Sequence, residues 1–309
     1  MSETVTSPRP APPSSGAERR RIEKRTSQTA EWLCVARACS YRDRSPYGHS
    51  EDWVAARLLN PVLRTASRFA RFRRFWGRLS RKGMYEWAVA RTRYVDAVFE
   101  KYASSVAQVL IMGAGYDTRG VRFEDRLRDA RVFEVDAPTT QADKLRGFRL
   151  RKIPLPANLT FVAVNFDHET AAERLAEAGF RNGLPTLYLL EGLTMYLAPE
   201  SVDETLRLIS DSAGSGSILV FDYAYADVLR GDTSRFGAEG VMKAVSEAGE
   251  SWRFGIEEGG IAEFLSRYGF QVVDEASPAE LERRFYTDPD GVCHGRVNGT
   301  QAVVTARKP

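Results

Sequence analysis

The sequence predicts an α/β protein with a doubly wound, mostly parallel sheet of seven strands, preceded by an N-terminal helical cap. Over most of the chain, short and almost continuously apolar segments alternate with segments of helical periodicity. This alternation is typical of a parallel sheet that helices cover on both faces. One apolar segment, Val109–Met112, ends at two glycines, Gly113 and Gly115, and the next ends at Asp136. Such strand ends form the ligand-binding edge of an open α/β sheet.

The composition predicts three regions along the chain. Residues 1–22 are rich in Pro, Ser and Ala and end in charge, which predicts a disordered tail. Residues 23–104 carry helical signals and should form the cap, while residues 105–309 should form one α/β core. Ser27 or Thr29 is expected to cap the first helix.

The cap contains a strongly basic segment, Arg64–Lys82, which has no acidic residue. Its large apolar side chains recur at helical spacing, and its arginines lie largely on another side; these apolar residues are Phe69, Phe72, Trp76 and Leu79. One interpretation is an amphipathic helix that covers the ligand site and leaves a solvated basic face. The other is a helix that binds RNA or a membrane surface. The small net charge of +3 favours the first.

The core elements follow in order from the apolar pattern. Strands are predicted at 106–112, 131–135, 159–164, 186–190, 217–222, 270–274 and 300–306, with helices at 117–127, 139–150, 169–178 and 200–213. The carboxyl ends of parallel strands share one edge of the sheet. We therefore expect Asp136, Asn165 and Glu191 to lie near the glycine loop.

The first two strands carry the pattern of a nucleoside site. Asp136 follows Gly115 by 21 residues, close to the roughly 20 of a nucleoside-binding βαβ unit. Its carboxylate would accept hydrogen bonds from ribose hydroxyls, whereas Glu134 is expected to point to the other strand face and is the less favoured ribose ligand. Thr118 replaces the third glycine of a dinucleotide loop, and Asp117 is acidic where phosphates would gather. A pyrophosphate ligand such as NAD is therefore disfavoured.

Six motifs resemble the leucine carboxyl methyltransferases and their bacterial relatives, which include enzymes of polyketide and other natural-product pathways. They are Gly83–Glu86, Ala90–Arg93, Gly113–Arg119, Phe133–Pro138, Glu191–Leu197 and Trp252–Gly255. The likeness runs from about Thr26 to the C-terminus. It implies a Rossmann-like class I methyltransferase fold, S-adenosyl-L-methionine as cofactor, and O-methylation of a carboxylate or hydroxyl.

The resemblance also implies roles for individual residues. Gly113 and Gly115 would lie against the methionine part of the cofactor, and Asp136 would bind its ribose. Arg91 would pair with the cofactor carboxylate through its planar fork, although Arg93 competes for this role. Glu191 would lie near the sulfonium.

Adenine recognition is expected to follow the third strand. Asn165 stands where the family commonly has an acid, and its amide can still address an adenine edge. Phe166 offers a backbone amide and a stacking face, and Asp167 is an alternative adenine ligand. Asn165 could equally end the strand, and Asp167 could cap the next helix.

No catalytic residue is evident from the sequence. A carboxylate acceptor has a pKa of about 4 and needs only alignment, whereas a phenol, with a pKa of about 10, would benefit from a base. Glu191, Tyr196 and His294 are the candidates near the acceptor. Aromatic residues are expected either to wall the acceptor site or to pack in the core; these are Tyr223, Tyr225, Trp252 and Phe254.

The expected partner is a small-molecule acceptor, a carboxylic acid or a phenol, and neither nucleic acid nor a membrane. Cys34, Cys39 and Cys293 lack metal-ligand spacing and are expected to be reduced thiols. No signal segment or apolar run of about 18 residues appears, so a cytoplasmic protein is expected. Remaining alternatives are a methyltransferase of protein C-terminal carboxylates, a dehydrogenase, an inactive binder, and a nucleic-acid-binding module using the basic segment.

Overall fold

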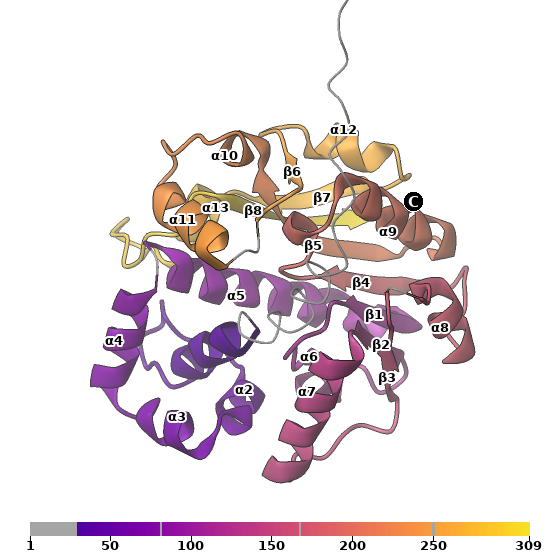
Figure 1. The fold of residues 1–309 in the computed structure, drawn as a ribbon, viewed down its shortest axis with the longest axis horizontal. Coiled ribbons are helices and arrows are strands. Elements are labelled where there is room, and N and C mark those ends of the chain that lie inside the picture. Colours follow the sequence, from indigo (N-terminus) through magenta and orange to yellow (C-terminus); the bar gives the residue numbers. More distant parts are fainter. Residues whose placement is uncertain (1–29, 81, 167, 249–250) are drawn as a thin grey trace, which may run out of the picture.

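The computed structural model describes residues 30–80, 82–166, 168–248 and 251–309. The tail predicted for residues 1–22, the expected caps Ser27 and Thr29, and Asp167 lie outside the described residues. The described chain folds around one sheet with helices on both faces (Figure 1).

The sheet has the strand order β3-β2-β1-β4-β5-β8-β7, and a short β6 pairs with the end of β5. The strands are β1 Gln108–Met112, β2 Arg131–Asp136, β3 Leu159–Ala163, β4 Thr186–Leu190, β5 Ile218–Tyr225, β6 Gly255–Ile256, β7 Gln271–Ala276 and β8 Gln301–Arg307. The strands from β3 to β5 are parallel, whereas β8 runs antiparallel to β5 and β7. All seven predicted strands are confirmed; the two-residue β6 was not predicted.

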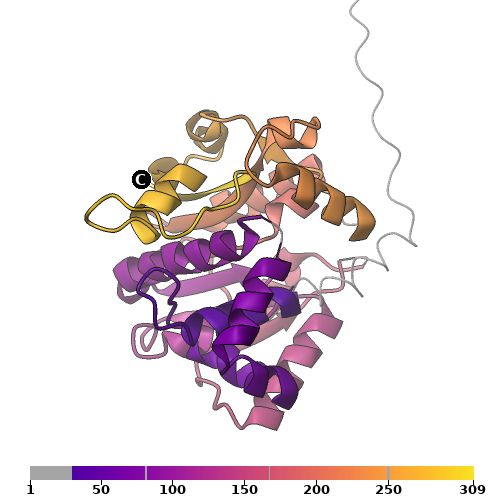
Figure 2. The ribbon, with the colours of Figure 1, turned by 90° about the vertical axis from the view of Figure 1, so that its left-hand side faces the viewer.

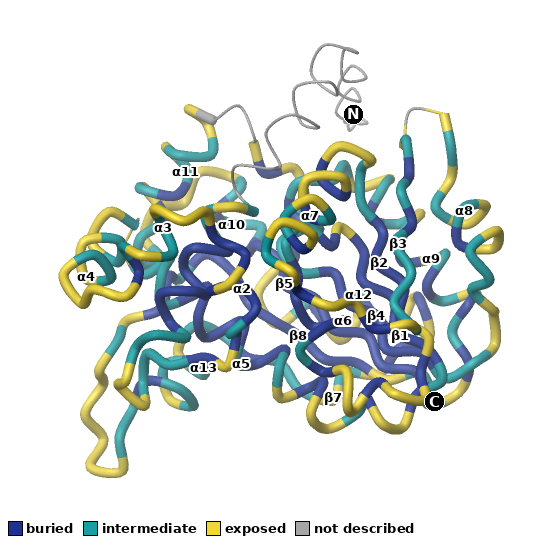
Figure 3. The backbone as a smooth tube through the Cα atoms, turned by 90° about the horizontal axis from the view of Figure 1, so that it is seen from below, coloured by how far each residue is buried: buried dark blue, intermediate teal, exposed yellow. Residues whose placement is uncertain are grey.

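Both faces of the sheet are buried, as the apolar strands predict. In β1, Leu110 contributes to one hydrophobic cluster, whereas Val109 and Ile111 contribute to another, because successive side chains point to opposite faces. The first cluster lies under α8 (Ala171–Glu177), α9 (Pro199–Ser212) and α12 (Ile261–Ser266). The second lies under α5 (Met84–Tyr102) and α13 (Pro278–Phe285). Figure 3 shows the strands buried between exposed outer helices.

The cap lies beside the helices that follow β1 and β2 (Figures 1 and 2). It consists of a helix over residues 30–41, α2 (Trp53–Leu58), α3 (Pro61–Ala66) and α4 (Ala70–Leu79). Its apolar side chains form a third cluster with Val121 of α6 (Arg119–Arg122) and Phe148 of α7 (Pro138–Arg151). The cap therefore packs directly against the first βαβ unit, where the glycine loop lies.

The remaining elements are short connections near the sheet. They are the 3-10 turns η1 (Ala103–Ser105) and η2 (Thr194–Tyr196), and the helices α10 (Ala226–Leu229) and α11 (Ala238–Ala248). The helix predicted for residues 117–127 is only the single turn α6, with turns over the residues that follow.

The basic segment is not one helix, contrary to the prediction. Ser67–Phe69 separate α3 from α4. The Ser67 hydroxyl donates to the carbonyl of Arg64, and Arg73 donates to the carbonyls of Ser67 and Arg68, so side chains bond the carbonyls that a continuous helix would use. Phe69, at 62% exposed, consequently faces solvent rather than joining an apolar stripe.

Cys34, Cys39 and Cys293 are free thiols, the first two buried. No cluster of potential metal ligands occurs among the described residues. None of the helices in the described ranges is both long and apolar enough to cross a bilayer.

Glu134 and Lys144 form a buried ion pair between β2 and α7, with Lys144 Nζ 2.6 Å from the Glu134 carboxylate. Glu134 stands two residues before Asp136 in β2, so both side chains lie on the same face of the sheet, and the expectation that Glu134 points to the other strand face is wrong. Burial raises its pKa to about 7, although the charge of Lys144 opposes the shift. The pKa of Glu134 in the folded state exceeds the unfolded value of about 4.3. Its contribution to the free energy of unfolding is therefore lost as the pH rises from about 4.3 through about 7.

We predict that K144M makes the protein more sensitive to high pH. Without the cation the pKa of Glu134 rises further, so Glu134 continues to lower the free energy of unfolding above the wild-type pKa. The difference in unfolding free energy between wild type and K144M should therefore increase by about 1 kcal/mol between about pH 6 and about pH 8. Urea unfolding at several pH values measures this loss. The double variant E134Q/K144M should remove the pH dependence, and a deficit in K144M that does not vary with pH would contradict the prediction.

Candidate functional site

The glycine loop and the end of β2 are joined by direct hydrogen bonds. The Gly115 N–H donates to a carboxylate oxygen of Asp136 at 2.5 Å, and the Ala114 N–H donates to the Val135 carbonyl at 3.0 Å. Gly113 and Gly115 have φ values of 64° and 45°, in the left-handed region that favours glycine. The two motifs that are 21 residues apart in sequence therefore form one structural unit.

Asp136 is positioned as a hydrogen-bond acceptor at the carboxyl edge of the sheet. Its second oxygen accepts the Ala137 N–H at 2.7 Å. Burial raises the pKa of Asp136, and the N–H groups of Gly115 and Ala137 oppose the shift by favouring the carboxylate. Because a carboxylate has about four lone-pair positions, these two bonds leave acceptor capacity for a ligand.

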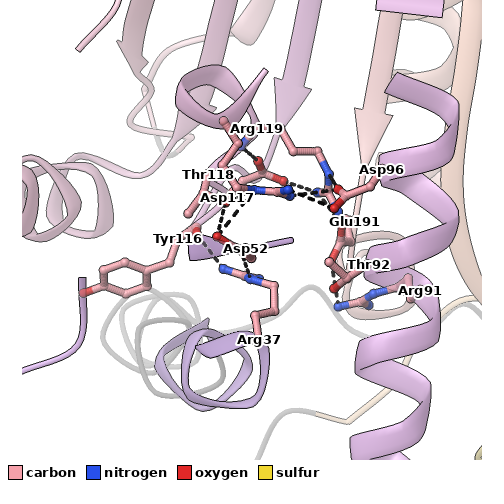
Figure 4. Close-up of polar contacts among 12 residues, drawn as sticks. Arg37, Asp52, Arg91, Thr92, Asp96, Tyr116, Asp117, Thr118, Arg119 and Glu191 are labelled. Carbon is pink, nitrogen blue, oxygen red and sulfur yellow. Dashed lines mark hydrogen bonds and ion pairs between the residues drawn. The ribbon is translucent and has the colours of Figure 1, made fainter. Parts of the chain in front are cut away.

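Next to this unit lies a buried network of charges, which we call the arginine–carboxylate cluster (Figure 4). It consists of Arg37, Arg91, Arg119, Arg122, Asp52, Asp96, Asp117, Glu191 and Asp222. Four guanidinium groups face five carboxyl groups, so the cluster carries one formal negative charge when every group is ionised. This excess makes the cluster suited to a cationic ligand.

Glu191 is held at the end of β4 by two arginines. Arg119 donates to its Oε2 at 2.7 Å, and Arg91 lies 3.1 Å from its Oε1. Burial alone would raise the pKa of Glu191, but the charges of Arg119 and Arg91 outweigh it and lower the pKa to about 2. Glu191 is therefore a fixed negative charge at neutral pH.

Arg91 is anchored by Asp222 of β5. One guanidinium nitrogen donates to the Asp222 carboxylate at 2.5 Å, and the other carboxylate oxygen accepts the Gly192 N–H at 2.6 Å. Asp222 therefore aligns both Arg91 and the backbone that follows Glu191.

Two buried guanidinium nitrogens of the cluster have no hydrogen-bond partner in the part of the chain that the structure describes. They are Nε of Arg91 and Nη2 of Arg119. An unpaired buried N–H is costly, so these donors favour an anionic or carbonyl oxygen of a ligand. The same cluster thus offers acceptors and donors.

Residues of the cap fasten the glycine loop from outside. Arg37 donates to the Tyr116 carbonyl at 2.6 Å and to Asp52 at 2.9 Å. Asp52 also accepts the Thr118 hydroxyl and, as the N-cap of α2, the Ala55 N–H. The conformation of the loop therefore depends on the cap as well as on the sheet.

The other predicted site residues have different surroundings in the structure. Asn165 follows β3, and its N–H donates to Glu169; the neighbouring Phe166 side chain is 57% exposed. Tyr196 lies in η2, which follows the Glu191 turn. Asn165 and Phe166 as adenine ligands stay predictions, as do the roles of Arg91, Gly113, Gly115, Asp136 and Glu191.

His294 and Arg93 lie apart from the cluster. His294 is bonded to Asp288 and stacks on Tyr47. Arg93 donates to the Tyr47 and Phe285 carbonyls. Two residues along a helix correspond to a rotation of about 200°, so Arg93 and Arg91 point to nearly opposite sides of α5. The geometry thus favours Arg91 over Arg93 and gives His294 no contact with Glu191.

Of the aromatic residues expected near an acceptor, Tyr223, Tyr225 and Trp252 are buried and Phe254 is half-buried. The Tyr223 hydroxyl donates to Glu275 of β7, which is a core contact. Trp252 is 8% exposed, and its Nε1 has no partner among the described residues. The Arg253 N–H donates to Met195 and holds the Trp252 segment beside η2.

Sequence reasoning did not assign roles to several members of the cluster, namely Arg37, Asp52, Asp96, Arg119, Arg122 and Asp222. Two of them left a signal. Asp222 is an acidic residue inside an otherwise apolar strand, and Arg119 ends the glycine motif itself. The partners of these residues come from distant segments, so spacing alone did not identify them.

Comparison with known proteins identifies relatives of the chain. The family model described as leucine carboxyl methyltransferase matches residues 30–210. A protein of Bacillus subtilis (strain 168) with the provisional name S-adenosyl-L-methionine-dependent methyltransferase YktD is 26% identical over 201 residues, covering 65% of this chain and 66% of that protein. A provisionally named S-adenosyl-L-methionine-dependent methyltransferase of Mycobacterium avium (strain 104) is 32% identical over 203 residues, covering 62% of each. The chain thus spans about two-thirds or less of these relatives.

Two solved structures share the fold. A provisionally named methyltransferase of Thermobifida fusca has a TM-score of 0.57 and 18% identity, covering 88% of this chain and 94% of that one. A DUF574 family protein of Streptomyces avermitilis has a TM-score of 0.55 and 15% identity, covering 89% and 97%. At this identity the likeness concerns the fold, which is the predicted Rossmann-like class I methyltransferase fold.

We predict that D52N destabilises the fold. Asparagine can still cap α2, but it leaves the buried guanidinium of Arg37 without its counter-charge, at a cost of about 3 kcal/mol. Urea unfolding followed by tryptophan fluorescence measures the change. The exposed control D129N should change the unfolding free energy by less than about 0.5 kcal/mol, and an equally small effect of D52N would contradict the assigned clamp.

Proposed function

Because the chain belongs to the leucine carboxyl methyltransferase family, we propose that it uses S-adenosyl-L-methionine to methylate a carboxylate oxygen of a small-molecule acceptor. The observation that carries the proposal is the meeting of the glycine loop, Asp136 and Glu191 at one edge of the sheet. The polyketide-like nature of the acceptor is part of the proposal and rests on the resemblance of the sequence motifs.

The charges of the site fit this cofactor. S-adenosyl-L-methionine carries a carboxylate, an ammonium and a methyl-bearing sulfonium, and the sulfonium supplies the methyl group. The unpartnered donors of Arg91 and Arg119 would bind the carboxylate, and Glu191 would face the cationic groups. Asp136 would accept the ribose hydroxyls, and Asn165 and Phe166 would lie toward the adenine.

A dinucleotide fits less well. Helix N-termini attract phosphates through free backbone N–H groups. Here the Arg119 N–H, at the start of α6, already donates to the Asp117 side chain at 2.6 Å. A pyrophosphate would meet a carboxylate at this position, which supports a cationic nucleoside over NAD.

The protein is proposed to act on the acceptor by alignment. A carboxylate is ionised at neutral pH and attacks without a general base, so the residues of the site need only position it and exclude water. His294 contacts Asp288 and Tyr47, neither of which belongs to the arginine–carboxylate cluster, and this supports the proposal of catalysis without a base. A phenol acceptor or a protein C-terminal carboxylate are the alternatives.

We predict that D136A and R91K weaken cofactor binding in distinguishable ways. D136A should weaken both S-adenosylhomocysteine and adenosine by about 10- to 100-fold, because both carry the ribose. R91K should weaken S-adenosylhomocysteine but leave adenosine unchanged, since only the former has the methionine carboxylate. Calorimetry measures both affinities. Unchanged binding in D136A, or no binding by folded wild type, contradicts the proposed site.

We predict an alkali-labile product and a flat pH profile. After incubation with methyl-labelled cofactor and a panel of acids and phenols, an ester releases methanol in alkali, whereas an aryl ether does not. The rate of methyl transfer to a carboxylic acid should vary little between about pH 6 and about pH 9, because neither the acceptor nor Glu191 titrates there. A titration near neutrality in the chemical step, or ethers alone, would favour the phenol alternative.

A further inference from the structure

The cap has a surface on which apolar and basic side chains are exposed together. Val62, Phe69, Phe75 and Leu79 are between 58% and 76% exposed. They are four of the nine large apolar side chains exposed in the described chain, although they lie within 18 residues. We call the exposed side of α3, α4 and the turn between them the α3–α4 surface. Scattered exposed apolar residues are ordinary, but such a concentration marks an interaction surface.

The charge of the α3–α4 surface is positive throughout. Its exposed cations are Arg68, Arg71, Arg74, Arg78 and Lys82. The sequence from Trp53 to Tyr85 contains no Asp or Glu. In α4 the exposed Phe75 and Leu79 lie one turn apart, and Arg71, Arg74 and Arg78 flank them. The surface therefore combines apolar anchors with uncompensated positive charge.

A groove of about 920 Å³ lies at the start of α4 and continues this surface. Arg42, Arg44, Arg68 and Arg73 line it. Nε of Arg42 is buried without a partner among the described residues. Burial, and then the charge of Arg68, lowers the pKa of Arg42, which shows that cations are crowded here.

The acids at the groove have partners of their own. Asp43 accepts the Ser45 N–H at 2.9 Å, and Glu51 lies 3.0 Å from His49. The groove thus offers guanidinium groups to an anionic group of a ligand.

We propose that the α3–α4 surface docks the protein on a bilayer that contains anionic phospholipids. Phe75 and Leu79 would enter the headgroup region, the arginines would contact lipid phosphates, and the groove would receive a headgroup. This departs from the expectation of no membrane partner, which rested on the overall charge. The inference concerns the cap alone and does not depend on the methyl acceptor.

Two observations favour lipid over other anionic partners. Val62 and Leu79 are aliphatic and cannot stack on bases, so RNA would leave them without a favourable contact. The apolar side chains protrude, and charged side chains are the majority of those that line the neighbouring groove, so the groove is a poor pocket for the apolar anchors of a protein partner. Figures 1 and 3 both place α3 and α4 at the outer edge of the molecule, where a flat bilayer can reach them.

The test is flotation of the full chain with vesicles of phosphatidylcholine, alone or mixed with phosphatidylglycerol. The protein should float only with the anionic vesicles, and added salt should weaken binding. R71Q/R74Q/R78Q should lower the partition coefficient by about 100-fold. The control R128Q/R207Q/R267Q removes the same charge from exposed positions elsewhere and should bind as wild type. Absence of binding to anionic vesicles, or an equal loss in the control, overturns the proposal.

A second pair of variants separates lipid from polyanions in general. F75S/L79S should lower binding to anionic vesicles by about 10-fold or more but leave retention on a single-stranded RNA homopolymer unchanged. Vesicle binding equal to wild type would mean a general polyanion site and would overturn the proposal. Because the substituted residues are exposed, unfolding midpoints should match wild type; should one variant fail to fold, R74Q and L79S provide the same comparison singly.

Discussion

The contact of Arg119 with Glu191 is the interaction on which the arrangement of the site depends. Arg119 begins α6 directly after the glycine loop, and Glu191 directly follows β4. Through one guanidinium group, the loop of the first strand, the end of the fourth strand and Asp96 of α5 are held together. Each charge is buried, so it is stable only while its partners are in place. The site is therefore built as a unit rather than as independent residues.

Such a network of charges is costly to bury, and a gain in folding stability alone does not explain why the protein contains it. A protein in which well-packed apolar residues replace a buried ion pair is often at least as stable. What the cluster provides is fixed direction: Asp222 aligns Arg91 and the backbone after Glu191. Where a ligand carries both signs of charge, fixed partners need little reorganisation when it binds. Nε of Arg91, which has no partner in the described ranges of the chain, is consistent with a cluster completed by a ligand.

Most of the fold was predictable because its signals are local. Apolar strands, glycines with positive φ and the acid after β2 can be recognised within a few residues of sequence. The cluster was not predictable in the same way: Asp52 and Thr118 are 66 residues apart, and Arg91 and Asp222 are 131 apart. Spacing does not reveal such pairs. The break at Ser67 was also missed, because side-chain bonds to carbonyls replaced the helical ones there.

The arginines of the chain serve two opposite electrostatic purposes. Those of the buried cluster face slightly more carboxylates than guanidinium groups, so their charge is locally cancelled. Those of α4 have no acid in their sequence neighbourhood and stay uncompensated. The net charge of +3 is the sum over both environments. A small net charge therefore argues against an anionic partner only where the charges are spread evenly over the surface. Since surface potentials are screened within about 10 Å, a partner that approaches α4 meets the local charge and not the average.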